Sequence, residues 1–243
     1  MKPRIICHIM ASVDGRLLPE RWTPPFDGKT MGEVCQSYQS ISRQLGTGAW
    51  MFGKNTLQES FFPQTFCHEG LPKAGNTVPF HGARPSERMF IVADPLGEIL
   101  YTANTVRGDG IITILGEDVS EDYLTHLKEM GISFLFAGKD GKGLGLAMES
   151  LYHDFCIDSI SLQGGAIING AFLKAGLIDE LSLLIYPGID GLAGIPSIFE
   201  YAGKQNEIPA KGQSLELVDV ATLGNGVVSL RYRFHRETPI NNI

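Results

Sequence analysis

The sequence is poor in cysteine, with four in 243 residues, at positions 7, 35, 67 and 156. They lie far apart and form no Cys-x-x-Cys pair, so the chain has no disulfide framework and its thiols are typical of a reduced, cytoplasmic protein. The one hint of a metal cluster is Cys67-His68 together with His81. Neither the number of ligands nor their spacing matches a zinc site, so we predict no metal.

Long apolar runs and an excess of basic residues are also missing. The first apolar run, residues 5–10, is interrupted by His8 and is too short for a signal peptide or a membrane span. Lys and Arg number 20 against 27 Asp and Glu, which gives a net charge of -7. Proteins that bind nucleic acids or acidic membranes usually show a basic excess. We therefore expect neither a nucleic acid nor a membrane as a partner.

Glycine, in contrast, is abundant, with 29 residues. This is well above the usual share of about 7% and indicates many tight turns, or backbone that approaches a ligand closely. Hydrophobic residues make up 43% and charged residues 19% of the chain. These values are those of a globular protein and exclude a disordered or fibrous chain.

Apolar runs rich in β-branched residues alternate with helical patterns along most of the chain. Strands are predicted over residues 4–10, 49–52, 89–93, 111–115, 132–136, 157–162, 180–186, 215–223 and 227–234. Helices are predicted over residues 30–45, 55–60, 121–130, 144–155 and 167–175, with Ser120 as the cap of the third. The last two strands flank Gly224-Asn225-Gly226, which is a hairpin turn signal.

This alternation predicts an α/β fold in which a mixed, mostly parallel sheet carries helices on both faces and ends in an antiparallel C-terminal hairpin. No linker or repeat divides the sequence, so we expect a single domain over residues 1–243. The segments 61–88 and 187–213 are too long for simple connectors, and loops of that length in a compact domain usually serve function.

Two strand-to-helix turns are candidate binding sites. After the strand 157–162 comes Gln163-Gly164-Gly165 and then a helix. Glycines at such a turn let a ligand touch the backbone, and free N–H groups at a helix start attract phosphate. The second turn has Gly53 at the strand end and Lys54 and Thr56 at the helix start. The alternatives are a tight turn without a ligand in the first case, and a surface lysine with a capping threonine in the second.

Together these segments resemble a known family. The turn Ser12-Val13-Asp14-Gly15-Arg16 follows the first strand, Gly53-Lys54-Asn55-Thr56 follows the second, and Leu162-Gln163-Gly164-Gly165 is followed by Asn169, Leu173, Gly176, Leu177, Asp179-Glu180-Leu181 and Pro187. This pattern resembles the reductase domain of riboflavin biosynthesis, the C-terminal part of the bifunctional deaminase–reductase, within the dihydrofolate-reductase-like superfamily. The resemblance runs from residue 4 to about residue 234.

The resemblance implies a three-layer dihydrofolate-reductase-like fold and an NADPH-dependent reductase of an aminopyrimidine ribosyl phosphate, usually a homodimer. Gly53, Lys54 and Thr56 would then hold the adenosine-phosphate side of NADPH, and Gly164 and Gly165 would cradle its pyrophosphate. The turn 12–16 would close over nicotinamide and substrate. By the same resemblance Ser12 and Asn169 belong to the cofactor site, and Asp14 and Gln163 are catalytic candidates.

Three features of the sequence bear on the substrate. Gln163 stands where the family has Glu, which keeps a hydrogen-bonding group but loses a charge. The family's arginine- and aspartate-bearing stretch is replaced by residues 57–63. Trp22-Thr23-Pro24-Pro25-Phe26-Asp27 resembles the approach to the active-site helix of dihydrofolate reductases. Asp27 is therefore a third catalytic candidate, which would bond a pterin-like ring, and its alternative is a turn.

A cation for an anionic substrate has to come from elsewhere. The proline-containing segment 61–88 carries Arg84 and Arg88, and arginine suits bidentate recognition of phosphate. We expect one of the two to face the substrate pocket, and the alternative is a solvated surface charge.

Three other functions stay open at this stage. They are reduction of a dihydrofolate or pterin, a catalytically silent relative that has kept the nucleotide site, and an unrelated α/β protein that binds flavin or phosphate.

Overall fold

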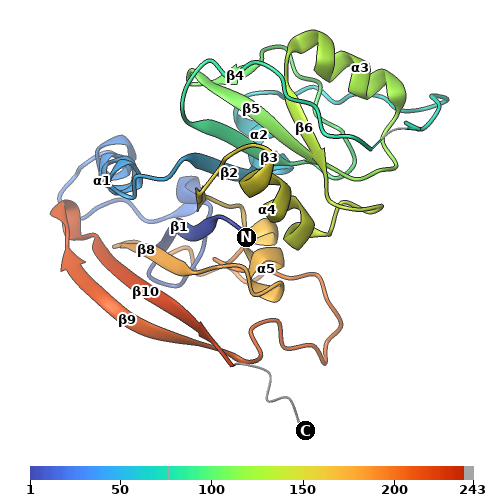
Figure 1. Ribbon diagram of the computed structural model, residues 1–243. Coiled ribbons are helices and arrows are strands. Elements are labelled where there is room, and N and C mark those ends of the chain that lie inside the picture. Colours follow the sequence, from blue (N-terminus) through green and yellow to red (C-terminus); the bar gives the residue numbers. More distant parts are fainter. Residues whose placement is uncertain (76, 238–243) are drawn as a thin grey trace, which may run out of the picture. The chain divides into compact units, whose positions relative to one another are not determined.

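The computed structural model describes residues 1–75 and 77–237 of the chain (Figure 1). The described chain divides into two compact units, each built from separate segments of the sequence. The first unit holds residues 1–4 and 47–165, and the second holds residues 5–46 and those from 166 onward. The expectation of a single domain over residues 1–243 stays a prediction.

Six strands form the sheet of the first unit, in the order β4-β5-β3-β2-β7 with β6 paired to β5. The strands are β2 (Ala49–Gly53), β3 (Met89–Ala93), β4 (Thr105–Val106), β5 (Asp109–Leu115), β6 (Ser133–Phe136) and β7 (Ser159–Leu162). Every pair is parallel except β4 with β5. Because β2 pairs in parallel with both β3 and β7, the carboxyl ends of these three strands lie at one edge of the sheet.

The helices of the first unit are α2 (Lys54–Ser60), α3 (Glu121–Met130) and α4 (Leu144–His153). One core cluster joins Leu57 of α2 and Tyr123 of α3 to Phe90 and Val92 of β3. Side chains of a strand alternate between the two faces, so Ile91 points to the opposite face, where α4 lies (Figure 1). Both faces of this sheet are therefore covered by helices, as predicted.

The second unit has four strands in the order β1-β8-β10-β9. Its elements are β1 (Arg4–Ser12), α1 (Met31–Gln44), α5 (Ala166–Lys174), β8 (Glu180–Tyr186), β9 (Gln213–Thr222) and β10 (Val228–Arg236), with short 3₁₀ turns at Pro19–Arg21 and Gly224–Gly226. β1 and β8 are parallel, whereas β10 is antiparallel to both β8 and β9. The antiparallel C-terminal hairpin is thus confirmed.

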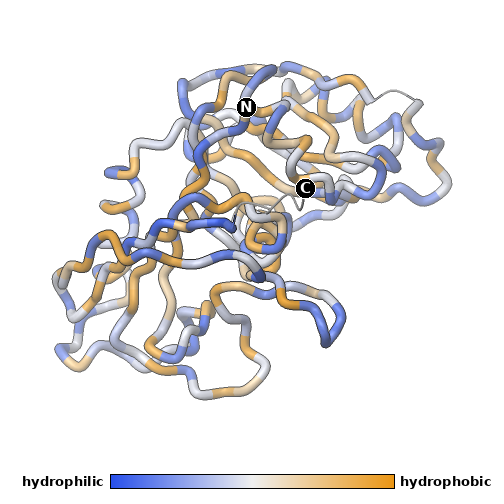
Figure 2. Tube along the Cα trace, turned by 60° about the horizontal axis from the view of Figure 1, so that its bottom comes forward, coloured by the Kyte–Doolittle hydropathy of each residue, from blue (hydrophilic) through white to orange (hydrophobic). Residues whose placement is uncertain are grey.

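Helix α1 covers the β1–β8 pair through a second apolar cluster. Val34 of α1 packs with Met10, Leu184 and Tyr186, and the ring of Trp22 stacks on Tyr186 with centroids 5.0 Å apart. In Figure 2 hydrophobic stretches alternate with hydrophilic ones along the trace of the chain. The hydrophobic effect of these two cores is the main force that holds each unit together.

The predicted helices and strands correspond to real elements, of which β3, α3 and β8 have the predicted bounds and the others have ends shifted by one or two residues. The helix predicted from residue 30 begins at Met31, because Thr30 is its cap and forms a capping box with Glu33. Ser120 caps α3 as expected, accepting a hydrogen bond from the N–H of Tyr123. The two-residue strand β4 was not predicted, because two residues are too few to show a periodicity. The described parts of segment 61–88 contain no helix or strand.

A close backbone contact in the second unit explains one glycine in a helix. A Cβ atom on Gly170 of α5 would lie 1.9 Å from the carbonyl oxygen of Glu200, so only glycine fits there. The same segment is held to α5 by two hydrogen bonds, from Glu200 N–H to the Ala166 carbonyl at 3.0 Å and from Asn169 Nδ2 to the Ile198 carbonyl at 3.0 Å. Glycine here lets the loop lie directly against the helix.

We expect Gly170→Ala to lower the free energy of unfolding by about 1–3 kcal/mol, because the loop must move away from α5. Gly145→Ala is the matched control, since Gly145 also lies in a helix but its Cβ would meet nothing within 4 Å. This control should be neutral or stabilise by up to about 1 kcal/mol through helix propensity. Urea unfolding of both variants measures the difference, and equal effects would contradict the close-contact explanation.

Candidate functional site

The glycine turn after β7 is fastened to the end of β2. The N–H of Gln163 donates to the Met51 carbonyl at 2.8 Å, and the N–H of Gly53 donates to the Gly164 carbonyl at 2.9 Å. Gly164 has a φ of +93°, which a residue with a side chain adopts only under strain. A Cβ on Gly165 would lie 3.5 Å from Thr56 Oγ1. The absence of that Cβ leaves open backbone facing the first turn of α2.

The end of β2 and the end of β3 place charged groups beside this turn. Lys54 is the first residue of α2, and its Nζ forms an ion pair with the carboxylate of Glu98. Asp94 directly follows β3 and is fully buried, and its carboxylate accepts the backbone N–H groups of Glu98 at 3.1 Å and Ile99 at 2.9 Å. Burial raises the pKa of Asp94. One cation and two carboxyl groups therefore meet at this edge of the sheet.

Gln163 is buried, and its amide Nε2 donates to Ser161 Oγ at 3.0 Å. The side chain is thus held by Ser161 of β7, the strand that Gln163 directly follows. A carboxylate at position 163 would be a buried negative charge. The amide of Gln163 can donate and accept hydrogen bonds and is uncharged.

The turn after β1 forms a second, separate cluster in the second unit. Ser12 Oγ donates to Asp14 Oδ1 at 2.6 Å and accepts the N–H of Arg16 at 2.9 Å. The Asp14 carboxylate also accepts the N–H groups of Asp190 at 3.2 Å and Gly191 at 2.9 Å. The hydroxyl of Ser12, followed by the N–H of Gly191, lowers the pKa of Asp14 to about 2. Asp14 is therefore ionised at neutral pH, and it fastens the segment after β8 to this turn.

Two other predicted site residues of the second unit have structural partners. Asp27 is exposed and pairs with Lys29, its Oδ2 lying 2.6 Å from Nζ, which lowers the pKa of Asp27. Asn169 is fully buried in α5, and its Oδ1 has no hydrogen-bond partner among the described residues. The surroundings of Asp27 fit the alternative of a surface turn. The Oδ1 atom of Asn169 is a buried hydrogen-bond acceptor that could still accept a bond from a ligand.

The two arginines of segment 61–88 have different surroundings. Arg84 donates to the backbone carbonyls of Phe155 at 3.0 Å and Glu87 at 3.1 Å. Arg88 pairs with Asp109, Nε to Oδ2 at 2.9 Å, and its guanidinium lies 4.2 Å from the ring centroid of Trp50. Arg84 is thus engaged by backbone, whereas Arg88 stacks on an aromatic ring.

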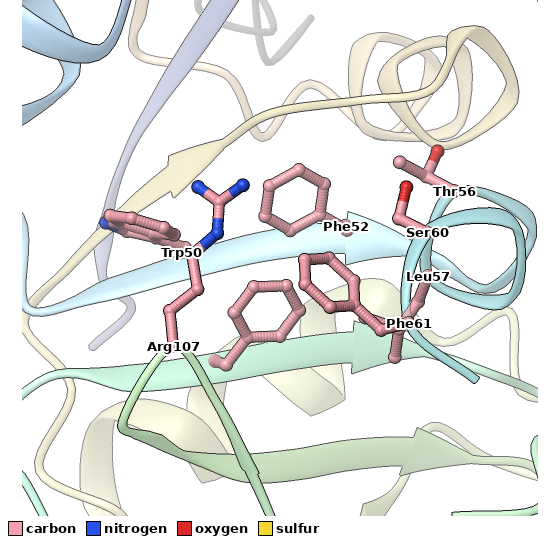
Figure 3. Close-up of a pocket in the computed structure, with 8 residues that line it drawn as sticks. Trp50, Phe52, Thr56, Leu57, Ser60, Phe61 and Arg107 are labelled. Carbon is pink, nitrogen blue, oxygen red and sulfur yellow. The ribbon is translucent and has the colours of Figure 1, made fainter.

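Trp50 belongs to an aromatic pocket in the first unit (Figure 3). The rings of Phe52 and Phe90 stack with centroids 4.9 Å apart, and Phe61 stands edge-on to Phe90. The pocket is lined by Trp50, Phe52, Thr56, Leu57, Ser60, Phe61, Phe90 and Arg107. Figure 3 shows Arg107 extending from its turn toward Trp50 and Phe52, while Thr56 and Ser60 face the pocket from α2. The pocket thus combines flat apolar walls, two hydroxyl groups and a cation.

Comparison with known families decides the identity. The model of the RibD C-terminal domain family matches residues 3–229, nearly the whole chain. The chain belongs to this family. RibD C-terminal domains are the pyrimidine reductases of riboflavin biosynthesis, so the chain is an oxidoreductase whose family uses a nicotinamide cofactor.

Solved structures show the same fold at low sequence identity. A pyrimidine reductase-like protein from Corynebacterium diphtheriae is 18% identical, with a TM-score of 0.66, over 97% of this chain and 93% of that one. RibD from Acinetobacter baumannii is 18% identical with a TM-score of 0.64, and the match covers 96% of this chain but only 58% of that protein. The riboflavin biosynthesis reductase of Saccharomyces cerevisiae is 14% identical with a TM-score of 0.58, over 96% and 90% of the two chains. The dihydrofolate-reductase-like fold is confirmed.

The first unit of this RibD C-terminal domain brings together six of the predicted residues. Gly53, Lys54, Thr56, Gln163, Gly164 and Gly165 all lie where β2 and β7 end. Ser12 and Asp14 form their own cluster. The roles of all the predicted site residues, Asp27, Asn169, Arg84 and Arg88 included, stay predictions. Sequence reasoning missed Asp94, Glu98 and Arg107. Asp94 carried a signal in the sequence, since an acidic residue directly follows the predicted strand 89–93.

The described residues contain no group of three or more His, Cys, Asp or Glu side chains arranged to hold a metal ion. The hinted cluster does not form, because His68 bonds to Ser120 Oγ and the Gly97 carbonyl, and His81 stacks on Phe155. In the part of the chain that the structure describes, no helix is long and apolar enough to cross a membrane.

Proposed function

We propose that the protein reduces a pyrimidine ribosyl phosphate with NADPH, in the manner of a 5-amino-6-(5-phosphoribosylamino)uracil reductase. The observation that carries this proposal is the open glycine turn at 164–165 beside Lys54 and Thr56, in a chain of the RibD C-terminal domain family. A pterin reductase is the second candidate. Its support is weaker, because Asp27 is exposed and paired with Lys29 rather than directed into a buried site.

The residues at the carboxyl edge fit the phosphates of a dinucleotide. Bare backbone at Gly165 and the hydroxyl of Thr56 lie close enough to contact one phosphate group, and the Lys54 ammonium supplies a charge-assisted hydrogen bond for the 2′-phosphate. NADPH supplies the hydride when bound. The protein then has to hold the hydride donor and the hydride acceptor in line, because correct positioning of the two reactants lowers the barrier to reaction.

We place the planar ring of the substrate in the aromatic pocket of Figure 3. Flat walls formed by Trp50 and Phe52 favour a planar ring, and Arg107 faces the same space. Arg107 has no ion-pair partner among the described residues, and its guanidinium lies 5.7 Å from the ring centroid of Phe61. We assign Arg107 to the anionic end of the substrate, whereas Arg88, expected in this role from the sequence, already pairs with Asp109 and stacks on Trp50. Arg84 is a poorer candidate, since its guanidinium already bonds two carbonyl groups.

Replacing Lys54 with Ala should weaken NADPH binding by about 1.5–3 kcal/mol, the worth of a charge-assisted hydrogen bond. NADH lacks the 2′-phosphate, so its affinity should change much less. Fluorescence titration of both dinucleotides measures this difference. Equal loss for the two, or no loss, would remove Lys54 from the cofactor site.

Replacing Arg107 with Ala should raise KM for a pyrimidine ribosyl phosphate about tenfold, the lower end of what a hydrogen bond to a charged group contributes. Neither the Kd of NADPH nor the KM of the unphosphorylated ribosyl analogue should change. Arg84→Ala is the matched control and should leave all three constants unchanged. An unchanged KM for the phosphorylated substrate in the Arg107 variant would place the anion elsewhere.

We also propose that the enzyme is a homodimer of the cytoplasm. All four cysteines are free thiols, as a reducing compartment would leave them. The hairpin β9–β10 (Figure 1) presents one apolar face, because Leu215, Leu217 and Val220 pair with Phe234, Tyr232 and Leu230. Each of the three β9 side chains is at least half exposed. Such an exposed apolar face is typical of an interface, and a two-fold axis would bury it against its own copy.

A lysine in place of Leu217 should therefore convert the dimer into a monomer at micromolar concentration, since the interface would have to bury an unpaired charge. Ser214→Lys adds the same charge on the other face of the same strand, where Ser214 pairs with His235, and should leave the dimer intact. Sedimentation velocity distinguishes the two. A wild-type protein that sediments as a monomer would contradict the proposal outright.

A further inference from the structure

The turn after β3 fixes the position of one acidic side chain beside Lys54. Asp94, fully buried, accepts the backbone N–H groups of Glu98 and Ile99 at 3.1 and 2.9 Å, and the Gly97 N–H donates to the Asp94 carbonyl at 3.0 Å. These bonds define the course of the backbone through residues 94–99. The position of the Glu98 Cα atom is therefore fixed by the turn.

The pairing of β2 with β3 brings Glu98 next to Lys54. β2 and β3 are parallel, and Gly53 lies opposite Ala93 in the register. The residues that follow the two strands thus leave the sheet at the same level, and the Lys54 ammonium pairs with the Glu98 carboxylate. The two side chains are 26% and 31% exposed, so a solute can reach both. An anion that binds to Lys54 therefore meets the negative charge of Glu98 beside the ammonium group.

The two groups favour different ligands. An ammonium attracts a 2′-phosphate dianion, whereas a carboxylate repels it. A carboxylate near the ribose instead accepts a hydrogen bond from a free 2′-hydroxyl, which is the usual feature of sites that take NAD rather than NADP. A dinucleotide with a 2′-phosphate must therefore displace Glu98 from Lys54, and one without it need not.

We propose that Glu98 is a specificity-determining residue, which limits the preference for NADPH over NADH by competing with the 2′-phosphate for Lys54. This inference rests on the proposed function, because it assumes that Lys54 faces the adenosine ribose. Glu98 acts on the ligand directly through its charge. The ratio of two affinities reports its effect, independently of the rate of hydride transfer.

The test measures binding of adenosine 2′,5′-bisphosphate and of 5′-ADP by titration calorimetry. Glu98→Gln keeps the size of the side chain and removes its charge. We expect it to bind the 2′,5′-bisphosphate about tenfold more tightly than the wild type does, the lower end of what a charged hydrogen bond contributes. Its affinity for 5′-ADP should stay the same or fall.

Two further variants make the result specific. Glu59→Gln removes the same charge from an exposed position of α2 and should leave the ratio of the two affinities unchanged. In a Lys54→Ala background, Glu98→Gln should lose most of its effect on that ratio, because the cation for which carboxylate and phosphate compete is gone. The shift of the thermal unfolding midpoint with each nucleotide is the second readout.

The outcomes distinguish the role of Glu98 from the proposed function itself. An unchanged ratio in Glu98→Gln, with both nucleotides bound by the wild type, would overturn the role of Glu98 and leave the proposed function standing. An equal gain in Glu59→Gln would also overturn it, since the effect would then be one of net charge. A wild-type protein that binds neither nucleotide nor NADPH would overturn the dinucleotide site itself.

Discussion

Parallel pairing of β2 with β3 on one side and with β7 on the other is the constraint on which the candidate site depends. It brings three strand ends to one edge of the sheet, although the residues that follow them are 40 to 110 positions apart in the sequence. Backbone bonds from Gln163 and Gly53 then fasten the glycine turn to β2. No single segment could form this edge, because each contributes only one kind of group: a cation, an acid or bare backbone.

Charge at this edge is balanced within the protein itself. Lys54 is paired with Glu98, and the nearby Asp94 is buried, with a raised pKa and two backbone donors. Such an arrangement keeps the cation in position before any ligand arrives. It also sets a cost for every anion that binds, since partner exchange at Lys54 must precede or accompany binding. In the proposed cofactor site, the affinity for an anion and the selectivity between anions would therefore depend on the same ion pair.

Local signals in the sequence were enough to predict most of the fold. Ser120 before α3 and Thr30 before α1 are capping residues whose side chains do what their types predict. Gly164 marks a turn that only glycine adopts easily. The family resemblance followed from such motifs, because each of them is short and continuous. Where the ends of helices and strands differ from the prediction, they differ by one or two residues, since capping and tertiary contacts, rather than periodicity, decide where an element stops.

What the sequence could not predict depends on contacts between distant residues. The pair Lys54–Glu98 spans 44 positions and requires the register of β2 with β3. Arg107 stands on a two-residue turn between β4 and β5, and β4 is too short to leave a pattern. Arg84 and Arg88 looked equivalent in the sequence, yet one bonds to backbone carbonyls and the other to Asp109 and Trp50. The sequence shows which residues are cations, but the partner of each cation depends on the fold.

The short helix α2 connects the two ends of the proposed site. Lys54, at its start, faces the acidic turn after β3, whereas Ser60 and Phe61, at and just after its end, line the aromatic pocket. Thr56 takes part in both, since its Oγ1 faces Gly165 and its side chain also lines the pocket. Leu57 anchors the helix in the core between them. One helix of seven residues thus carries both the group that would bind the cofactor and part of the surface that would hold the substrate. Hydride transfer requires that donor and acceptor be held in line, and a helix shared by both sites would contribute to that alignment.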